Sequence, residues 1–330
     1  MNKPDFRVTY AGLKLRNPII VASSGLTDTV DKVKILESSG AGAVVLKSLF
    51  EEQIMAGVNA ELDLGGDNSN PEAADLLRTF ATSDELGHYV DLIRQCKEAV
   101  GIPVIASINC HSLRDWTDFA RHIEGAGADA LEINVMYIDT DKNFAHGQTE
   151  LLHLEILGKL RRTVGIPIIM KLSRGFTSPV ALATQIQHND AGGVVLFNWP
   201  YSPDIDLAKI RFVPGRIVTS HAFFADVMRW TGIISGLVPK LDVAASGGID
   251  SGDDLIKTLL VGGKAAEICS AVYRKGPDVI EELLLRLGEW MTDHDFHCIN
   301  DFRGRLNFTS FNDASYYERL QFMKYDREEH

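Results

Sequence analysis

Short apolar segments recur along this chain, and stretches with the spacing of amphipathic helices lie between them. Eight of these segments have the length and uniform apolarity of strands that are buried on both faces. They lie at residues 18–22, 43–47, 103–108, 130–135, 166–172, 193–197, 243–245 and 264–271. Strands that alternate with helices of about 10 to 15 residues predict βαβ units and a parallel sheet. Eight units favour a closed (β/α)8 barrel, the TIM-barrel architecture, over a doubly wound sheet.

Two longer segments interrupt this regular alternation. Residues 49–84 are rich in Gly, Asn and acidic side chains and exceed an ordinary connection, so we expect a lid or insertion on the C-terminal face. Residues 198–236 show no clear period before a helix near 225–237. Residues 7–16 alternate as a short hairpin, and residues 297–330 form an irregular tail. No linker or repeat appears, which predicts one domain over residues 1–330.

Composition narrows the possible partners. The formal net charge of −12 disfavours nucleic acid and anionic membrane surfaces, because both require basic patches. No segment approaches the roughly 18 apolar residues of a membrane span, and the N-terminus lacks the apolar region of a signal peptide. The four cysteines show no metal-type CxxC pair and no disulfide spacing. We therefore expect a cytoplasmic protein without a structural metal.

The C-terminal ends of the predicted strands carry polar or small residues, which in such a barrel point toward the active site. These residues are Ser23, Ser24, Gly25, Lys47, Ser48, Asn109, Asn134, Lys171, Asn198, Ser246, Gly247, Gly248, Cys269 and Ser270. A lysine that ends a buried strand needs an anionic partner unless it extends to the rim. Lys47 and Lys171 both occupy such positions, and they predict an anionic ligand.

The turn after the seventh strand indicates a phosphate site. Gly247 and Gly248 permit a tight turn and close approach to backbone amides, and Asp250 or Ser251 can cap the next helix. The eighth strand ends at Cys269, in the barrel region where phosphates commonly bind. The strand-end asparagines each present donors and an acceptor, which suits a planar flavin or pyrimidine ring.

Several of these segments together resemble a known family. The motifs are AGAVVLKS, LEIN, IIMKLS, VVLFN, ASGGIDSG and EICSAVYRKGP. They are similar to class 1 dihydroorotate dehydrogenases and to the flavin domain of dihydropyrimidine dehydrogenase, over nearly all of residues 5–290. The resemblance implies a dimeric FMN enzyme of pyrimidine biosynthesis that moves a hydride between a dihydropyrimidine and flavin N5. It also implies that Ala22 to Gly25, Lys47 and Ser48 lie beside the flavin, that Lys171 lies near its N1 and O2, and that Gly247, Gly248, Cys269 and Ser270 hold its phosphate.

The substrate side departs from the family pattern. The family carries a catalytic Cys or Ser three residues after the strand-four asparagine, but here that position holds Tyr137 and the following Pro-Asn pair is missing. Trp199 stands where Ser or Thr is usual, and GGDNSNPEA replaces an Asn-x-x-Gly-x-x-Asn loop. We expect Tyr137, Lys171 and Lys47 as catalytic groups, with Cys110 and His111 as the nearest substitute bases.

Three hypotheses follow for the function. The first is an FMN-dependent oxidoreductase that acts on dihydroorotate or a related cyclic amide. The second keeps the flavin and replaces the substrate with another cyclic amide or an enone. The third is a catalytically altered FMN-binding homologue, or a subunit that provides its flavin to a partner. A barrel that binds sugar phosphates and no flavin is a less favoured alternative.

Overall fold

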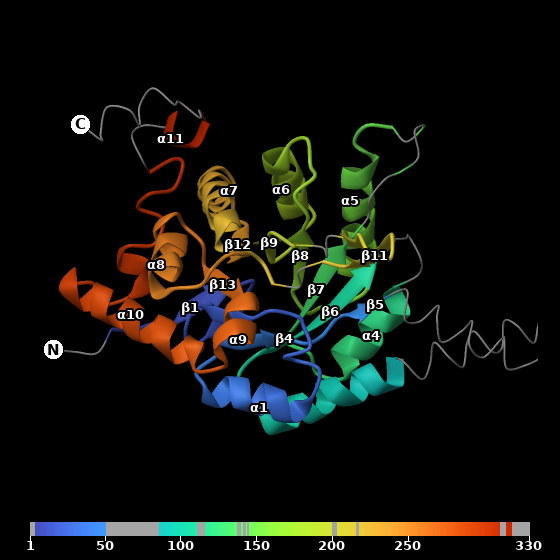
Figure 1. The fold of residues 1–330 in the computed structure, drawn as a ribbon, viewed down its shortest axis with the longest axis horizontal. Coiled ribbons are helices and arrows are strands. Elements are labelled where there is room, and N and C mark those ends of the chain that lie inside the picture. The colour runs from blue at the N-terminus through green and yellow to red at the C-terminus, as the bar shows by residue number, and fades with distance from the viewer. Residues whose placement is uncertain are drawn as a thin grey trace, which may run out of the picture.

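The computed structural model of the chain describes residues 4–50, 86–110, 116–136, 140, 143, 145–199, 203–215, 218–310 and 315–318. Its centre is a closed parallel barrel of eight strands, surrounded by helices (Figure 1). The barrel strands are β3 (Ile19–Val21), β4 (Ala43–Val45), β6 (Val104–Cys110), β7 (Ala130–Val135), β8 (Ile168–Leu172), β9 (Gly193–Leu196), β12 (Asp242–Ser246) and β13 (Ala265–Ile268). Pairing of β13 with β3 and of β4 with β6 completes the ring. The predicted (β/α)8 fold is therefore confirmed.

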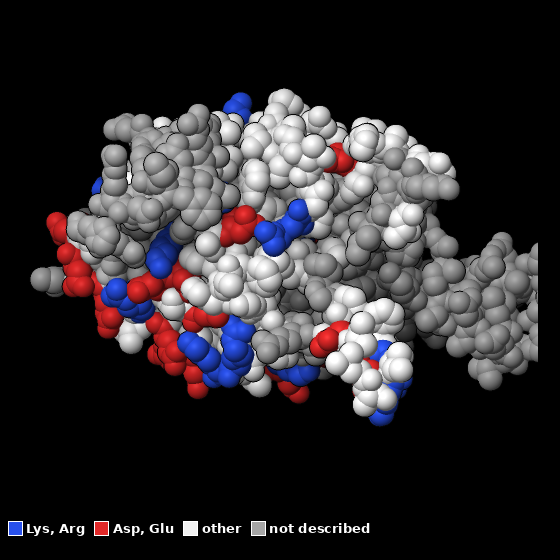
Figure 2. Space-filling view, turned by 45° about the horizontal axis from the view of Figure 1, so that its top comes forward, with Lys and Arg blue, Asp and Glu red and all other residues white. Residues whose placement is uncertain are grey.

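Helices between the strands cover the outside of the barrel. They are α1 (Val30–Ser38), a helix at 86–99, α4 (Thr117–Gly125), α5 (Gln148–Arg161), α6 (Pro179–His188), α7 (Phe224–Leu237), α8 (Gly252–Leu260), α9 (Ser270–Lys275) and α10 (Val279–Asp293). Their buried faces and the outward-facing strand residues form one continuous apolar core. After α10 follow the 3-10 helix η2 (Ile299–Asp301) and α11 (Ser315–Glu318). On the face in Figure 2, the described acidic and basic side chains are intermixed rather than separated by sign.

The N-terminal hairpin closes the lower end of the barrel. It consists of β1 (Val8–Tyr10) and β2 (Leu13–Leu15), and it packs Tyr10, Leu13 and Leu15 against the inward-facing apolar residues of the barrel. Tyr10 is fully buried, and its hydroxyl donates to the carbonyl of Val194 at 3.2 Å. The lower half of the interior is thus filled, so chemistry is confined to the upper, C-terminal end.

The second strand of the barrel is interrupted near that upper end. The N–H of Leu46 still bonds to Ile105 on β6, but residues 47 and 48 leave the ladder before β5 (Leu49–Phe50) pairs again with β6. The hydroxyl of Tyr89, from the helix at 86–99, enters this gap: it accepts from the Ser107 N–H at 2.7 Å and donates to the Ser107 carbonyl at 3.1 Å. Tyr89 therefore supplies the bonds that a continuous strand would have made.

Three sequence predictions need correction. The expected insertion begins inside β5, so residues 49 and 50 belong to the barrel, and the rest of 49–84 from residue 51 on lies outside the described residues. The eighth strand ends at Ile268 rather than at residue 271, because Ser270 already begins α9. The segment 198–236 contains an unpredicted hairpin, β10 (Pro203–Asp206) with β11 (Arg211–Pro214), and the 3-10 helix η1 (His221–Phe223).

Candidate active site

Parallel register brings three of the predicted residues to one level of the barrel. Asn109 on β6 is the direct neighbour of Asn134 on β7, and Asn134 is the direct neighbour of Lys171 on β8. All three are less than a tenth exposed. A fourth member, Asn198, follows β9 and donates its amide N–H to Asn134 Oδ1 at 3.1 Å. These strand-end residues therefore lie side by side, and their role in a common site stays a prediction.

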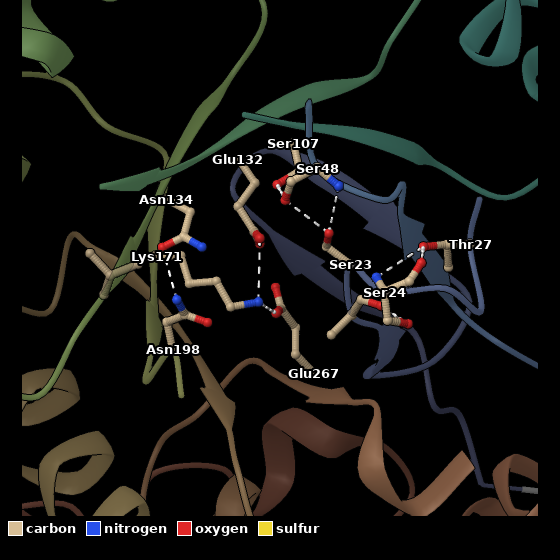
Figure 3. A network of polar contacts seen from close by, with 12 residues as sticks. Ser23, Ser24, Thr27, Ser48, Ser107, Glu132, Asn134, Lys171, Asn198 and Glu267 are labelled. Atoms are coloured by element: carbon tan, nitrogen blue, oxygen red, sulfur yellow. Dashed lines mark hydrogen bonds and ion pairs between the residues drawn. The ribbon is translucent and has the colours of Figure 1, made fainter. Parts of the chain in front are cut away.

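Lys171 crosses the barrel interior to two glutamates (Figure 3). Its Nζ lies 2.7 Å from Glu267 Oε2 on β13 and 3.3 Å from Glu132 Oε1 on β7. The side chains of Lys171, Glu132 and Glu267 are 7%, 1% and 0% exposed. The anionic partner that the sequence required for this lysine is therefore supplied by the protein itself.

Burial and proximity change the acidity of these groups. Burial raises the pKa of Glu132 well above its ordinary value, and the neighbouring Glu267 raises it further, while Lys171 opposes both effects. Burial alone would lower the pKa of Lys171, but the two carboxyl groups raise it above its ordinary value. Lys171 is thus charged at neutral pH, and the raised pKa of Glu132 favours its protonated form.

A chain of serine hydroxyls lies on the opposite side of the same layer. Ser23 Oγ lies 2.9 Å from Ser48 Oγ, which lies 2.8 Å from Ser107 Oγ. Ser23 Oγ also accepts from the Ser48 N–H at 2.9 Å. Nearby, Ser24 accepts the N–H of Leu26 at 3.2 Å and shapes the turn after β3. These bonds fix the turn on which residues 22–25 present their backbone to the top of the barrel.

The glycine turn after β12 contains unpaired backbone donors. Gly247 and Gly248 have φ angles of +110° and +75°, a region that side-chain-bearing residues avoid. In the described part of the chain, the buried N–H groups of Gly248 and Ile249 have no acceptor. Buried N–H groups are almost always paired in native proteins. These donors are therefore suited to an anion such as a phosphate.

Trp199 packs against the same turn. A Cβ at Gly247 would lie 2.1 Å from Trp199 Nε1, so only glycine fits beside the indole. The indole lies 4.1 Å from the ring of Phe223 between centroids, and the Arg174 guanidinium lies 4.7 Å from its ring centroid. Asp226 holds that guanidinium through an ion pair of 2.5 Å. Trp199 thus belongs to a fixed stack beside the site.

The residues after β13 lie close to the turn after β3. Cys269 is near Ser24 and Lys171; burial raises its thiol pKa, while both neighbours lower it. The hydroxyl of Ser270 accepts the N–H of Thr219 at 2.8 Å, which joins α9 to the segment before η1. Ser251 caps α8 and forms a reciprocal capping box with Asp254, as predicted for this turn.

Other predicted residues are placed differently or fall outside the description. Lys47 is exposed. Its side chain therefore extends to the rim of the barrel, one of the two possibilities that the sequence allowed, and it is not buried as Lys171 is. Ser246 is buried, and its carbonyl accepts from the Phe197 N–H. Tyr137 and His111 lie outside the described residues. Cys110 is buried at the end of β6.

Sequence reasoning missed the two glutamates. Glu132 is two residues before Asn134 and Glu267 is two residues before Cys269, and the period of two in a strand directs each pair to the same face. A carboxylate inside an otherwise apolar strand is rare unless it is paired. That signal is present in LEIN and in AAEI.

The fold and this site together define a (β/α)8 barrel whose C-terminal end carries a charged, amide-rich centre beside a turn that can bind phosphate. Within the described residues, no group of acidic, histidine or cysteine side chains forms a metal site, and no helix is long and apolar enough to cross a membrane. No family model matches the chain.

Known proteins with similar sequences are dihydroorotate dehydrogenases. The catalytic subunit of dihydroorotate dehydrogenase B (NAD+) from Thermoplasma acidophilum is 25% identical over 305 residues, which cover 91% of this chain and 98% of that protein. The corresponding subunit from Geobacter sp. M21 is 22% identical over 93% of this chain and 99% of its own. That from Methanocaldococcus jannaschii is 23% identical over 84% of this chain and 90% of its own. The predicted resemblance is confirmed, and this chain is a homologue of these enzymes.

Proposed function

We propose that this chain is an FMN-dependent oxidoreductase of the dihydroorotate dehydrogenase type, which acts on CH–CH groups of a cyclic dihydropyrimidine. The observation that carries the proposal is Lys171, whose ammonium is held by two buried glutamates and whose strand neighbour is Asn134, together with a turn that has unpaired backbone donors. The relatives, which match nearly the full length of the chain, support the oxidoreductase class.

The residues present fit a flavin mononucleotide. The unpaired N–H groups of Gly248 and Ile249 suit its phosphate, and the first turn of α9 offers further amides. The serine chain around Ser23 and Ser48 borders the space above the barrel. A bound flavin supplies the hydride acceptor, and the protein supplies orientation and electrostatics.

The protein groups have separate tasks in this proposal. The linked amides of Asn134 and Asn198 orient a planar ring, because each side chain presents a donor and an acceptor. Lys171 would supply positive charge to a bound ring, and Lys47 stands at the rim. The proton of the substrate carbon is assigned to Tyr137, the residue at the family's base position.

The assignment is tested with purified protein. The visible absorption bands of a flavin, with FMN released on heating, are the expected result, followed by anaerobic bleaching with dihydroorotate. Lys171→Ala should slow the reduction severely, whereas an unchanged rate would remove the role of this lysine. A protein that takes up no FMN on soaking would refute the flavin assignment and favour the sugar-phosphate alternative.

A second candidate is the reduction of a different cyclic amide or an enone. The stack of Arg174, Trp199 and Phe223 favours it, because it places an aromatic surface and a cation where the family pattern has a small hydroxyl residue. A panel of cyclic imides and enones separates the two: bleaching by dihydroorotate alone excludes this candidate. Tight binding of orotate without turnover would support a non-catalytic homologue instead.

We further propose a cytoplasmic homodimer. The hairpin β10–β11 leaves four large apolar side chains in solvent: Ile205, Leu207, Ile210 and Phe212 are 52%, 85%, 89% and 75% exposed, respectively. Such surfaces are commonly covered by a partner. No disulfide links the cysteines, which is compatible with a reducing compartment.

A further inference from the structure

The barrel interior contains more carboxyl groups than cations. Glu132 and Glu267 share one counter-ion, Lys171, and in the described part of the chain neither meets a second cation. If both carboxyls were ionised, the two carboxylates and the one ammonium would leave this buried layer with a net charge of −1. An uncompensated buried charge is costly enough that such groups bind a proton instead.

Two unsatisfied oxygen atoms indicate where that proton resides. Glu132 Oε2 and Glu267 Oε1 are both buried and without a hydrogen-bond partner, while the other oxygen of each carboxyl is occupied by Lys171. Two ionised carboxylates cannot bond to each other, because both only accept. The two carboxyls lie within hydrogen-bonding reach of each other, so one proton on either atom makes it a donor to the other carboxyl.

We propose that Glu132 and Glu267 share one proton and form a charge-neutral unit with Lys171, which positions this ammonium beneath the bound ring. The proton-sharing pair is a property of the protein alone. Its influence on the ring rests on the proposed flavin function. Glu132 and Glu267 are positioning residues here, because they act through Lys171 rather than on a substrate.

The surroundings of the pair agree with this charge state. The titratable groups that face it from the packed elements are Lys171 on β8, Tyr10 below, Tyr89 from the helix at 86–99 and Cys269 above. Burial raises the pKa of each tyrosine and of the thiol, so all three are neutral at physiological pH. The raised pKa of Glu132, caused first by burial and then by Glu267, has the same direction.

The charge count distinguishes single from double substitutions. In Glu132→Gln or Glu267→Gln, the remaining carboxyl ionises against Lys171, so the layer stays neutral but the shared proton is gone. The double variant leaves Lys171 without a counter-ion in the protein, so the buried ammonium is stabilised only when the bound ring itself becomes anionic on reduction. The single variants therefore test the shared proton, and the double variant tests the effect of the counter-ions on Lys171.

The proton is tested in the apo-protein by infrared spectroscopy at neutral pH. We expect the carbonyl stretch of a protonated carboxylic acid in the wild type, its loss in each single variant, and its retention in Glu155→Gln, a control on the exposed face of α5. A band that survives either single substitution overturns the proposal. If the variants do not fold, unfolding of the wild type at pH 7, where thiols stay protonated in both states, should release one proton, and no release overturns the proposal.

The effect on the ring is tested with the FMN-loaded protein. The double variant should shift the flavin midpoint potential upward and strengthen binding of reduced over oxidised FMN at least about tenfold, which corresponds to about 1.4 kcal/mol. The single variants should stay close to the wild type. Equal potentials in the double variant and the wild type overturn the positioning role. Failure of every form to bind flavin instead refutes the proposed function, while the infrared result still decides whether the proton is shared.

Discussion

Replacing Lys171 by methionine tests the electrostatics of the barrel interior most directly. Methionine is unbranched and close in length, so the packing of the side-chain stem is largely kept while the ammonium is removed. Because the side chains of Glu267 and Lys171 are 0% and 7% exposed, solvent screens their 2.7 Å contact very little. Removing one partner of a buried pair costs about 3–5 kcal/mol, so we expect that loss of stability at pH 7.

The sign of the pH dependence follows from the carboxyl groups that remain. Without Lys171, both glutamates are buried acids that hold protons in the folded state at pH values where the unfolded chain has released them. The folded state then binds more protons, so stability falls as the pH rises above the unfolded value of about 4.3. The limiting slope is about 1.4 kcal/mol per pH unit for each such proton. The loss of unfolding free energy in Lys171→Met, relative to the wild type, should therefore be smaller at pH 5 than at pH 7.

The assay is urea unfolding of the apo-protein at pH 7 and pH 5, followed by circular dichroism. Lys240→Met is the matched control: Lys240 is exposed, and its replacement should change stability by no more than about 0.5 kcal/mol. A loss below about 1 kcal/mol, or an equal loss at both pH values, would refute the view that Lys171 neutralises a buried carboxylate.

Three further substitutions test other parts of the molecule. Gly247→Ala introduces a Cβ 2.1 Å from Trp199 Nε1 and should weaken FMN binding, measured by fluorescence titration, whereas Gly87→Ala meets no atom within 4 Å and should leave it unchanged. Ser251→Ala removes the cap of α8 and should lower the unfolding free energy by about 1 kcal/mol; a loss near zero would contradict the capping role. If the protein forms the proposed dimer, Leu207→Ser, at a side chain 85% exposed, should convert it to a monomer in light scattering, and an unchanged dimer mass would exclude the hairpin as the interface.

The eight barrel strands could be predicted because parallel strands buried on both faces are continuously apolar, which is a local property of the sequence. The polar residues at their ends were predictable for the same reason, since parallel strands end at one edge. Asn109, Asn134 and Lys171 indeed lie side by side in the register. The cap at Ser251 depends only on neighbouring residues, so it could also be predicted from the sequence.

The hairpin β10–β11 escaped the sequence analysis for a local reason. Each of its strands has only four residues, most of them exposed, so neither is long enough to establish a period of two. Similarly, the interruption between β4 and β5 depends on Tyr89, a side chain from a helix some forty residues further along the chain. Neither feature leaves a periodic signal where it occurs.

What the sequence by itself determined is therefore the barrel, its catalytic end and the residue types collected there. What only the tertiary structure decided is how those residues are paired. Lys171 is 39 residues from Glu132 and 96 residues from Glu267, and closure of the barrel alone brings the three together. The sequence indicated that this lysine needed an anion, but the distances show that the anion belongs to the protein. Charge pairing in a buried layer is a property of three-dimensional proximity, and no local pattern encodes it.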